Sequence, residues 1–93
     1  MLKIAVTSKF KRDLKKVIKQ GKNRQKLDEI VCLLQERKAL PEKNRDHTLI
    51  GNYIGYRECH IAPDWLLIYR IKEDEAIELL ELARTGSHSE LFN

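Results

Sequence analysis

The stretch that decides the fold is Trp65-Leu66-Leu67-Ile68-Tyr69-Arg70-Ile71, in which Arg70 is the only charged residue. Aromatic and β-branched side chains of this kind favour the extended backbone. A short run that is apolar almost throughout is typical of a strand covered on both faces. We therefore predict a central strand over residues 65–71 and examine the flanking segments as its neighbours.

The preceding segment, residues 56–62, has the pattern of a second strand. Side chains alternate between the two faces of a strand. This rule places Tyr56, Glu58 and His60 on one face, and Arg57, Cys59 and Ile61 on the other. Pro63 and Asp64 then form a turn, so the two segments are expected to pair.

The segment that follows the central strand is ambiguous. Residues 72–75 are all charged and predict a polar turn. Beyond them, the Ala, Glu and Leu content of residues 76–84 favours a helix by propensity. Their position after a turn also allows a strand paired with residues 65–71. Local sequence alone favours the helix slightly.

The N-terminal half reads as a strand followed by two helices. Residues 2–6 predict a short strand, and residues 41–54 are expected to be irregular. Gly21 separates the two helices, Asn23 caps the second, and Leu40-Pro41 ends it. The short connection predicts an antiparallel helical hairpin facing one core. Its two apolar stripes consist of Phe10, Leu14, Val17 and Ile18, and of Leu27, Ile30, Val31 and Leu34.

Length and composition indicate one domain over residues 1–93, with 42% hydrophobic residues. No apolar run approaches the roughly 20 residues that span a bilayer, and no secretory signal is visible. Cys32 and Cys59 lack CxxC spacing and read as reduced thiols, with a thiolate nucleophile as a poorly supported alternative. We therefore expect a cytoplasmic protein without a membrane partner.

Positive charge is concentrated at the N-terminus. Residues 1–26 contain ten Lys or Arg residues and a single acid, Asp13. Lys11, Lys15 and Lys19 lie on the first predicted helix. Such a basic face indicates a polyanionic partner, most commonly a nucleic acid, with an acidic protein or an anionic lipid as alternatives. A merely solvated helix face is about equally compatible with charge alone.

Three histidines, His47, His60 and His88, have charged residues close by in the sequence. Histidine, arginine and carboxylate groups together can cleave RNA without a metal, because they move protons and stabilise phosphorane charge. Each histidine alone is more often a surface or hydrogen-bonded residue. The three histidines with Asp64 could instead hold zinc, but HxH, HExxH and CxxC spacings are absent. We expect neither a metal nor a small-molecule cofactor.

The order of four segments carries a resemblance to a known family. The pattern is DHxL at residues 46–49, YRxxH at 56–60, PDWLLIY at 63–69 and RTGSHxxLF at 84–92. This series resembles the YafQ-type toxins of the RelE/ParE superfamily over nearly the whole chain. The resemblance implies an α+β fold of RelE/ParE type. An N-terminal strand, a helical hairpin and a three-stranded antiparallel meander form one sheet, which makes residues 76–84 a strand.

The resemblance also implies a function and its residues. It implies an mRNA endoribonuclease that acts on the translating ribosome and is neutralised by a cognate antitoxin. His88 matches the principal general acid/base, and Arg84 a phosphate-binding arginine. The further implied catalytic residues are His47, His60, Asp64 and Glu58, and Phe92 matches the terminal aromatic that helps to hold the RNA. Apart from the resemblance, we predict that Arg57 and the helix lysines Lys11, Lys15 and Lys19 also bind RNA.

Two other functions fit the same features. A ParE-like toxin of this fold inhibits gyrase without cleaving RNA, although the three matched histidines argue against it. An RNA-binding module without catalysis would also use the basic helix. Codon preference, antitoxin identity, complex stoichiometry and the division of acid and base roles among the histidines do not follow from the sequence.

Overall fold

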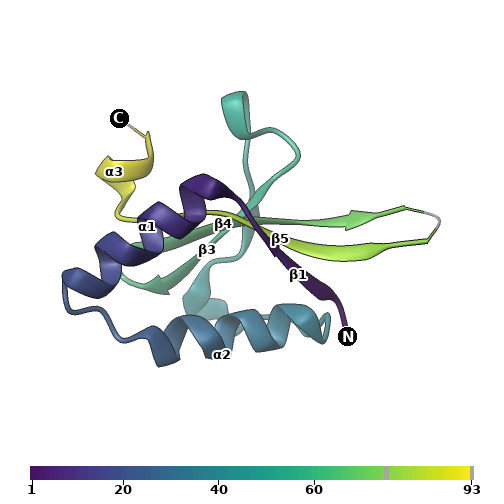
Figure 1. Cartoon of the computed structure of the whole chain (residues 1–93), viewed down its shortest axis with the longest axis horizontal. Helices are drawn as coiled ribbons and strands as arrows, with labels where there is room; N and C mark the ends of the chain where they lie inside the picture. The colour runs from purple at the N-terminus through teal and green to yellow at the C-terminus, as the bar shows by residue number, and fades with distance from the viewer. Residues whose placement is uncertain (75, 93) are drawn as a thin grey trace.

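The computed structural model describes residues 1–74 and 76–92, and it forms one sheet with helices on both faces (Figure 1). The elements, in chain order, are β1 Lys3–Val6, α1 Ser8–Lys19, α2 Arg24–Gln35, the 3₁₀ turn η1 Glu42–Asn44, β2 His47–Thr48, the 3₁₀ turn η2 Gly51–Tyr53, β3 Arg57–Ala62, β4 Trp65–Glu73, β5 Glu78–Gly86 and α3 His88–Phe92.

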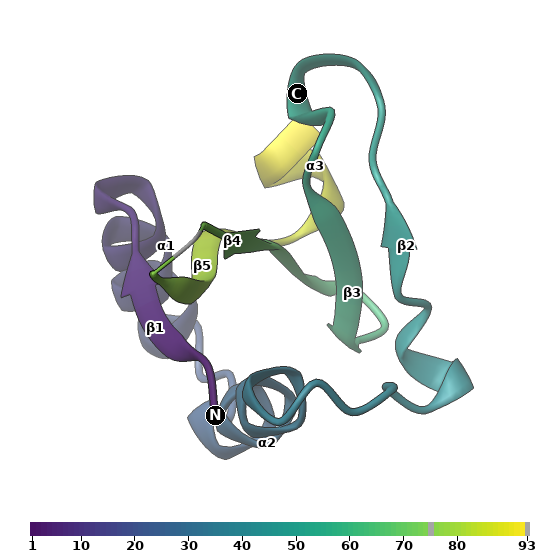
Figure 2. The same cartoon turned by 90° about the vertical axis from the view of Figure 1, so that its right-hand side faces the viewer.

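The strand order is β1-β5-β4-β3-β2. The strands β3, β4 and β5 form the predicted antiparallel meander, and β1 adds to β5 in parallel. The central position of β4 is confirmed: residues 65–69 are all buried, with Leu67 and Ile68 fully inaccessible. The sequence did not predict β2, which pairs His47 with Glu58 inside the segment expected to be irregular. Figure 2 shows β2 outermost, beyond β3.

The preference for helix in residues 76–84 is wrong, and the strand implied by the family resemblance is confirmed. The strand β5 lies between β1 and β4, where Leu80 is fully buried and Leu82 nearly so. Hydrogen bonds to two neighbouring strands and burial of these leucines outweigh the propensity of Ala, Glu and Leu for helix. The predicted turn is shorter than expected, because β4 continues to Glu73; Glu75 lies outside the described residues.

The helix termini agree with the sequence in all but one case. The Thr7 hydroxyl accepts a hydrogen bond from the Phe10 amide at 2.9 Å and caps α1, and Asn23 caps α2 through the Gln25 amide at 3.0 Å. The prediction that Leu40-Pro41 ends the second helix is wrong. Helix α2 ends at Gln35, because Arg37 adopts the left-handed conformation with φ of 56°.

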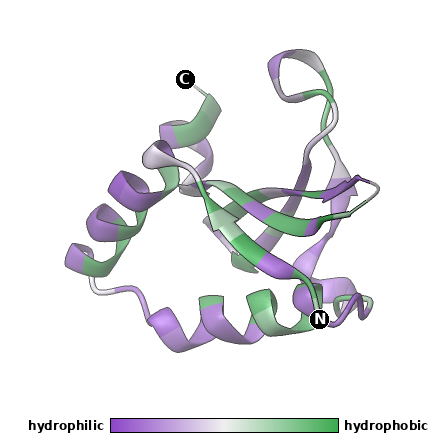
Figure 3. Cartoon of the chain, turned by 45° about the vertical axis from the view of Figure 1, so that its right-hand side comes forward, coloured by the Kyte–Doolittle hydropathy of each residue, from purple (hydrophilic) through white to green (hydrophobic). Residues whose placement is uncertain are grey.

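The helices α1 and α2 share one core beneath the sheet, as predicted. Phe10 and Val17 of α1 and Leu27 and Leu34 of α2 belong to a single buried cluster with Trp65 and its neighbours. Apolar and polar residues alternate along both helices in Figure 3, which is the pattern of helices with one buried stripe. The two helices run in opposite directions at an open angle (Figure 1).

The opposite face of the sheet carries the site. A smaller buried cluster of Leu66, Ile68, Ala83 and Leu91 lies on this face of the sheet. Because Leu91 belongs to α3, this helix packs on the same face. The loop around residues 49–56 rises beside α3 (Figure 1). The polar and charged side chains on this face form the candidate site. Within the described residues, no helix has the length and apolarity needed to cross a membrane.

Candidate active site

A bulge in β5 determines which residues face the site. Ile68 pairs with Arg84 and Tyr69 pairs with Leu82, so Ala83 is the extra residue. Paired residues on neighbouring strands carry their side chains on the same face. Arg84 therefore lies on the face of Ile68, and not on the helix-covered face of Leu82. Glu58 also pairs with Ile68, so Glu58 and Arg84 flank Ile68 in one row across three strands.

The carboxylate of Glu58 is buried between two imidazoles. Its Oε1 lies 3.4 Å from His47 Nε2 and 3.9 Å from His60 Nε2, and its side chain is only 6% exposed. Its Oε2 is buried and has no hydrogen-bond partner among the described residues. A buried oxygen without a donor is costly. This arrangement therefore provides an acceptor and two proton carriers at one point.

His47 and His60 are held by different means. His47 Nδ1 lies 2.7 Å from the carbonyl oxygen of Arg45, so this nitrogen carries the proton and Nε2 is directed towards Glu58. The amide of Asn44 donates to the main-chain carbonyl of His60 at 2.7 Å and fixes the strand edge. The side chain of His47 is half exposed, whereas that of His60 is mostly covered.

The side chain of Asp64 contacts the main-chain amide of His88. The His88 amide at the start of α3 donates to Asp64 Oδ1 at 3.2 Å. Asp64 thus fixes the start of α3, while the His88 side chain stays exposed. The pairing of His60 with Leu66, and of Leu66 with Gly86, places His60 two strands from the end of β5, a separation of about 10 Å at ordinary strand spacing. Within the described residues, no hydrogen bond or ion pair joins His88 to His47 or His60.

Three aromatic rings extend from His88 along the face. The His88 ring lies 4.9 Å from the Phe92 ring, centroid to centroid. Phe92 in turn lies 5.8 Å from Tyr53, and Tyr53 lies 6.1 Å from Tyr56. The guanidinium of Arg70 lies 4.5 Å above the ring of Tyr56. The sequence singled out Phe92 for RNA binding and left the two tyrosines open; here they form one aromatic surface with it.

Arg84 is held by a carboxylate from α1. Its Nε and Nη2 donate to Asp13 Oδ2 and Oδ1 at 2.6 and 3.1 Å. The pKa of Arg84 is raised, first by the hydrogen bond to Asp13 and further by Tyr53. Arg84 therefore keeps its charge beside the aromatic surface.

The other predicted RNA-binding residues lie elsewhere. Arg57 pairs in register with Tyr69, a residue of the core beneath the helices, and its guanidinium contacts Asp46 at 3.1 Å. It thus lies on the face opposite Glu58. Lys11, Lys15 and Lys19 are exposed along α1, where their spacing of four residues puts them on one side of the helix. The structure does not bring these four cations to the row of Glu58 and Arg84.

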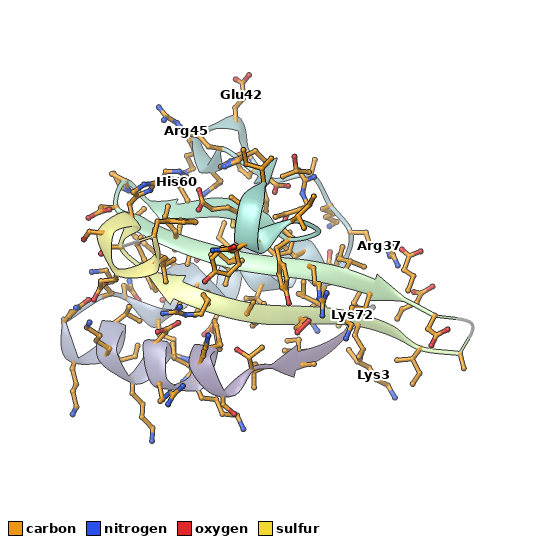
Figure 4. The ribbon with its side chains drawn as sticks, turned by 90° about the horizontal axis from the view of Figure 1, so that it is seen from above. Lys3, Arg37, Glu42, Arg45, His60 and Lys72 are labelled. Carbon is orange, nitrogen blue, oxygen red and sulfur yellow. The ribbon has the colours of Figure 1, made fainter. Side chains whose placement is uncertain are left out.

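Two hollows flank the candidate site. One of about 440 Å³ borders His60 and includes Lys26, Lys43 and Arg45 in its lining. Figure 4 shows Arg45 and His60 at the same end of the molecule. The second, of about 520 Å³, borders Phe92 and Tyr53. Sequence reasoning missed the three cations of the first hollow, since they come from α2, from η1 and from the residue that follows η1, and share no motif.

The structure also gives the surroundings of the two cysteines and bears on the alternative of a metal site. Cys59 is fully buried, and burial raises the pKa of its thiol to about 12, so the thiol stays protonated near neutral pH. Cys32 is exposed on α2, far in the chain from the histidines. Over residues 1–74 and 76–92, no three His, Cys, Asp or Glu side chains come together in a way that could hold a metal ion.

Glu90 attaches α3 to α1. Ser87 and Glu90 form a capping box, in which Glu90 Oε1 accepts from the Ser87 amide at 2.9 Å and the Glu90 amide donates to the Ser87 hydroxyl at 3.2 Å. Glu90 Oε2 contacts Lys16 Nζ at 2.7 Å. These donors, Lys16 first, lower the pKa of Glu90 to about 2. A Cβ at Gly86 would lie 3.3 Å from Glu90 Oε1, so a side chain there would displace this carboxylate.

We expect the contribution of Glu90 to stability to depend on pH. Because its pKa is lower in the folded state, its stabilisation is present above the ordinary pKa of about 4.5 and is lost as pH falls towards about 2. Thermal unfolding of wild type and Glu90→Gln between about pH 5 and pH 3 measures this. The wild type should lose its advantage as pH falls. A difference in melting temperature that does not change with pH would contradict the assignment.

The fold and this open face define a small α+β protein of the RelE/ParE type. Residues 2–93 match the family model described as the bacterial toxin of type II toxin-antitoxin system, YafQ. The mRNA interferase toxin YafQ of Escherichia coli K12 is 37% identical over 90 residues, which covers 96% of this chain and 94% of that protein. The chain therefore belongs to the YafQ family of type II toxins.

Solved structures agree with this assignment. The crystal structure of a metal-bound toxin from Helicobacter pylori is 44% identical, with a TM-score of 0.90, and the match covers 99% of this chain and 100% of that one. The toxin chain of the E. coli DinJ-YafQ toxin-antitoxin complex is 35% identical, with a TM-score of 0.86, and covers 99% and 98%. The RelE/ParE-type fold expected from the sequence is thus confirmed.

Proposed function

We propose that this toxin is an mRNA endoribonuclease that acts on the translating ribosome by acid–base chemistry without a metal. The observation that carries the proposal is the buried Glu58 carboxylate between two imidazoles, on the face that also presents Arg84 and His88. The likeness to a relative named mRNA interferase supports the reaction class.

The groups of this face can supply each step of RNA cleavage. A base removes the proton of the 2′-hydroxyl, and the 2′-oxygen attacks the adjacent phosphorus. The bond to the 5′-oxygen breaks as an acid protonates that oxygen, leaving a 2′,3′-cyclic phosphate and a 5′-hydroxyl. His88 serves as the principal acid–base group, with the His47–Glu58–His60 cluster as its counterpart. Arg84 stabilises charge on the phosphorane oxygens.

The two hollows suit an RNA strand on either side of that centre. The hollow beside His60 presents Lys26, Lys43 and Arg45 to a backbone phosphate. The aromatic hollow of Tyr53 and Phe92 suits a base, because bases stack on aromatic rings irrespective of sequence. The message would then run between α3 and the η1 turn, with the scissile phosphodiester near Glu58.

The proposed partners are the ribosome with its message and a cognate antitoxin. An antitoxin partner is supported by the complex that a similar toxin forms with DinJ. The exposed lysines of α1 would attract ribosomal phosphates, and also an acidic antitoxin segment. Translation takes place in the cytoplasm, so we propose that location for the toxin.

The direct test incubates the protein with translating ribosomes and examines message and gyrase activity in parallel. Fragments of defined length support the proposal. Gyrase inhibition with an intact message would instead indicate a ParE-like toxin. Binding to RNA with neither effect would indicate a module without catalysis.

Neutralising Lys11, Lys15 and Lys19 by Lys→Gln should weaken ribosome binding and leave the chemistry intact. For each phosphate that the variant no longer neutralises, the slope of log affinity against log salt should fall by about one unit. Ribosome affinity across a salt series measures that slope, and cleavage at saturating ribosome measures the chemistry. Lys72→Gln on β4, which removes one positive charge away from α1, is the control for each of the three single Lys→Gln variants. An unchanged slope would mean that these lysines do not face the ribosome.

A further inference from the structure

Asp13 is the only acid among the ten cations of residues 1–26, and it does not lie on the outer face of α1. Its side chain is only 15% exposed and is directed towards β5. An acid in a region selected for attracting polyanions weakens that attraction. Its inward position shows instead that it serves a contact within the protein.

That contact fixes the orientation of the Arg84 guanidinium. Asp13 accepts from Nε and Nη2 of Arg84, and Oδ2 also accepts from the Thr85 amide at 3.2 Å. A guanidinium carries five N–H donors in a rigid fork. The side-on pair with Asp13 uses two of them, and the guanidinium makes a further hydrogen bond with Tyr53. Asp13 thus holds one edge of Arg84, and the donors that neither Asp13 nor Tyr53 uses remain for a ligand.

The bulge at Ala83 distinguishes the Asp13–Arg84 pair from an ordinary structural ion pair. Without it, Arg84 would lie on the face of Leu82, beneath the helices. With it, the guanidinium reaches the face of Glu58 while α1 still holds its inner edge. Neighbouring contacts fix the same segment: Thr85 accepts from the Trp65 indole at 2.8 Å, and Lys16 holds Glu90.

We propose that Asp13 is a positioning residue for the cleavage reaction: through its side-on pair it holds Arg84 with its remaining donors directed at the scissile phosphate. Asp13 itself touches no substrate. Its carboxylate restricts the rotamers of Arg84 before RNA binds, so that binding does not have to order them. Lysine could not replace arginine here, because an ammonium lacks the fork that two acceptors can share.

The inference rests on the proposed RNA cleavage, and wild-type cleavage in the same assay tests that proposal separately. The experiment measures kcat and KM for cleavage of a ribosome-bound message by Asp13→Asn, Asp13→Glu, Arg84→Ala and the double variant Asp13→Asn/Arg84→Ala. Asparagine keeps the size and removes the charge, whereas glutamate keeps the charge and can form the pair again. Asp28→Asn on α2 is the matched control, because Asp28 loses only an exposed pair with Arg24.

We expect Asp13→Asn to lower kcat about tenfold with KM nearly unchanged, since a misplaced group reduces the rate and not the binding of the message. Asp13→Glu should recover most of the rate. In the Arg84→Ala background, Asp13→Asn should have no further effect on kcat, because the group that it positions is absent. Asp28→Asn should cleave as wild type.

Three results would overturn the inference. They are wild-type kcat in Asp13→Asn, an equal loss in Asp13→Glu, or the same fractional loss from Asp13→Asn in the presence and absence of Arg84. Thermal unfolding of each variant is recorded alongside, and rates are compared below all melting temperatures. Should Asp13→Asn fail to fold, the Glu variant decides: a kcat near wild type supports the proposal, and a kcat as low as that of Arg84→Ala overturns it.

Discussion

His88→Ala should abolish most of the cleavage of a translated message while the protein stays folded and binds its antitoxin. Positioned general acid–base groups contribute roughly 10² to 10⁴ to rate, so a loss of that size is expected in kcat. The fold should survive because the His88 side chain is exposed and its contact with Asp64 uses the main-chain amide. Quantifying full-length message over time on ribosomes measures the effect.

Ser89→Ala is the matched control for this variant. Ser89 is the next residue of α3, is exposed, and has its hydroxyl 3.4 Å from that of Ser87. Its loss should leave cleavage within about twofold of wild type, as for most surface substitutions. Cleavage by His88→Ala at the wild-type rate would remove His88 from the mechanism.

Glu58→Gln should lower cleavage by about two orders of magnitude, because an amide can neither take up a proton nor stabilise an imidazolium. Stability should behave differently. The carboxylate is almost fully buried and one of its oxygens has no partner in the described chain. Burial of a charge costs more than burial of an amide. The melting temperature of Glu58→Gln should therefore be equal to that of the wild type or higher.

The combination of lost activity with unimpaired stability is what distinguishes a reacting group from a structural one. Cleavage rates and melting temperatures of Glu58→Gln are therefore read together with those of Glu78→Gln. Glu78 is an exposed acid at the start of β5 whose pair with Arg37 is remote from the histidines in the chain. A Glu58→Gln protein that cleaves normally, or that melts well below wild type, would count against the proposed role.

Much of the fold could be predicted because hydrophobic pattern and turn chemistry agree. Residues 65–69 of the predicted central strand are buried as their composition implies, and Thr7 and Asn23 cap the helices. The wrong preference for a helix has a physical cause, namely that tertiary contacts outweigh local propensity. Residues 76–84 have helical composition, yet strands on both sides of β5 hold it extended.

Only part of the candidate site could be predicted from the sequence. Alternation along residues 56–62 correctly placed Glu58 and His60 on one face and Arg57 on the other. The bulge at Ala83, which turns Arg84 onto that face, leaves no signal in a strand pattern. The pairing of Arg84 with Asp13, 71 residues away in the chain, likewise depends on the packing of α1 against β5.

The central claim is that the 2′-oxygen of the message is the nucleophile, activated by side chains of the open sheet face. A ribosome programmed with a short message carrying a single 2′-deoxynucleotide at the cleavage position tests it most directly. Our account predicts that this message stays intact, while the same substitution one nucleotide downstream leaves cleavage unchanged. Cleavage of the 2′-deoxy position at the normal rate would contradict it.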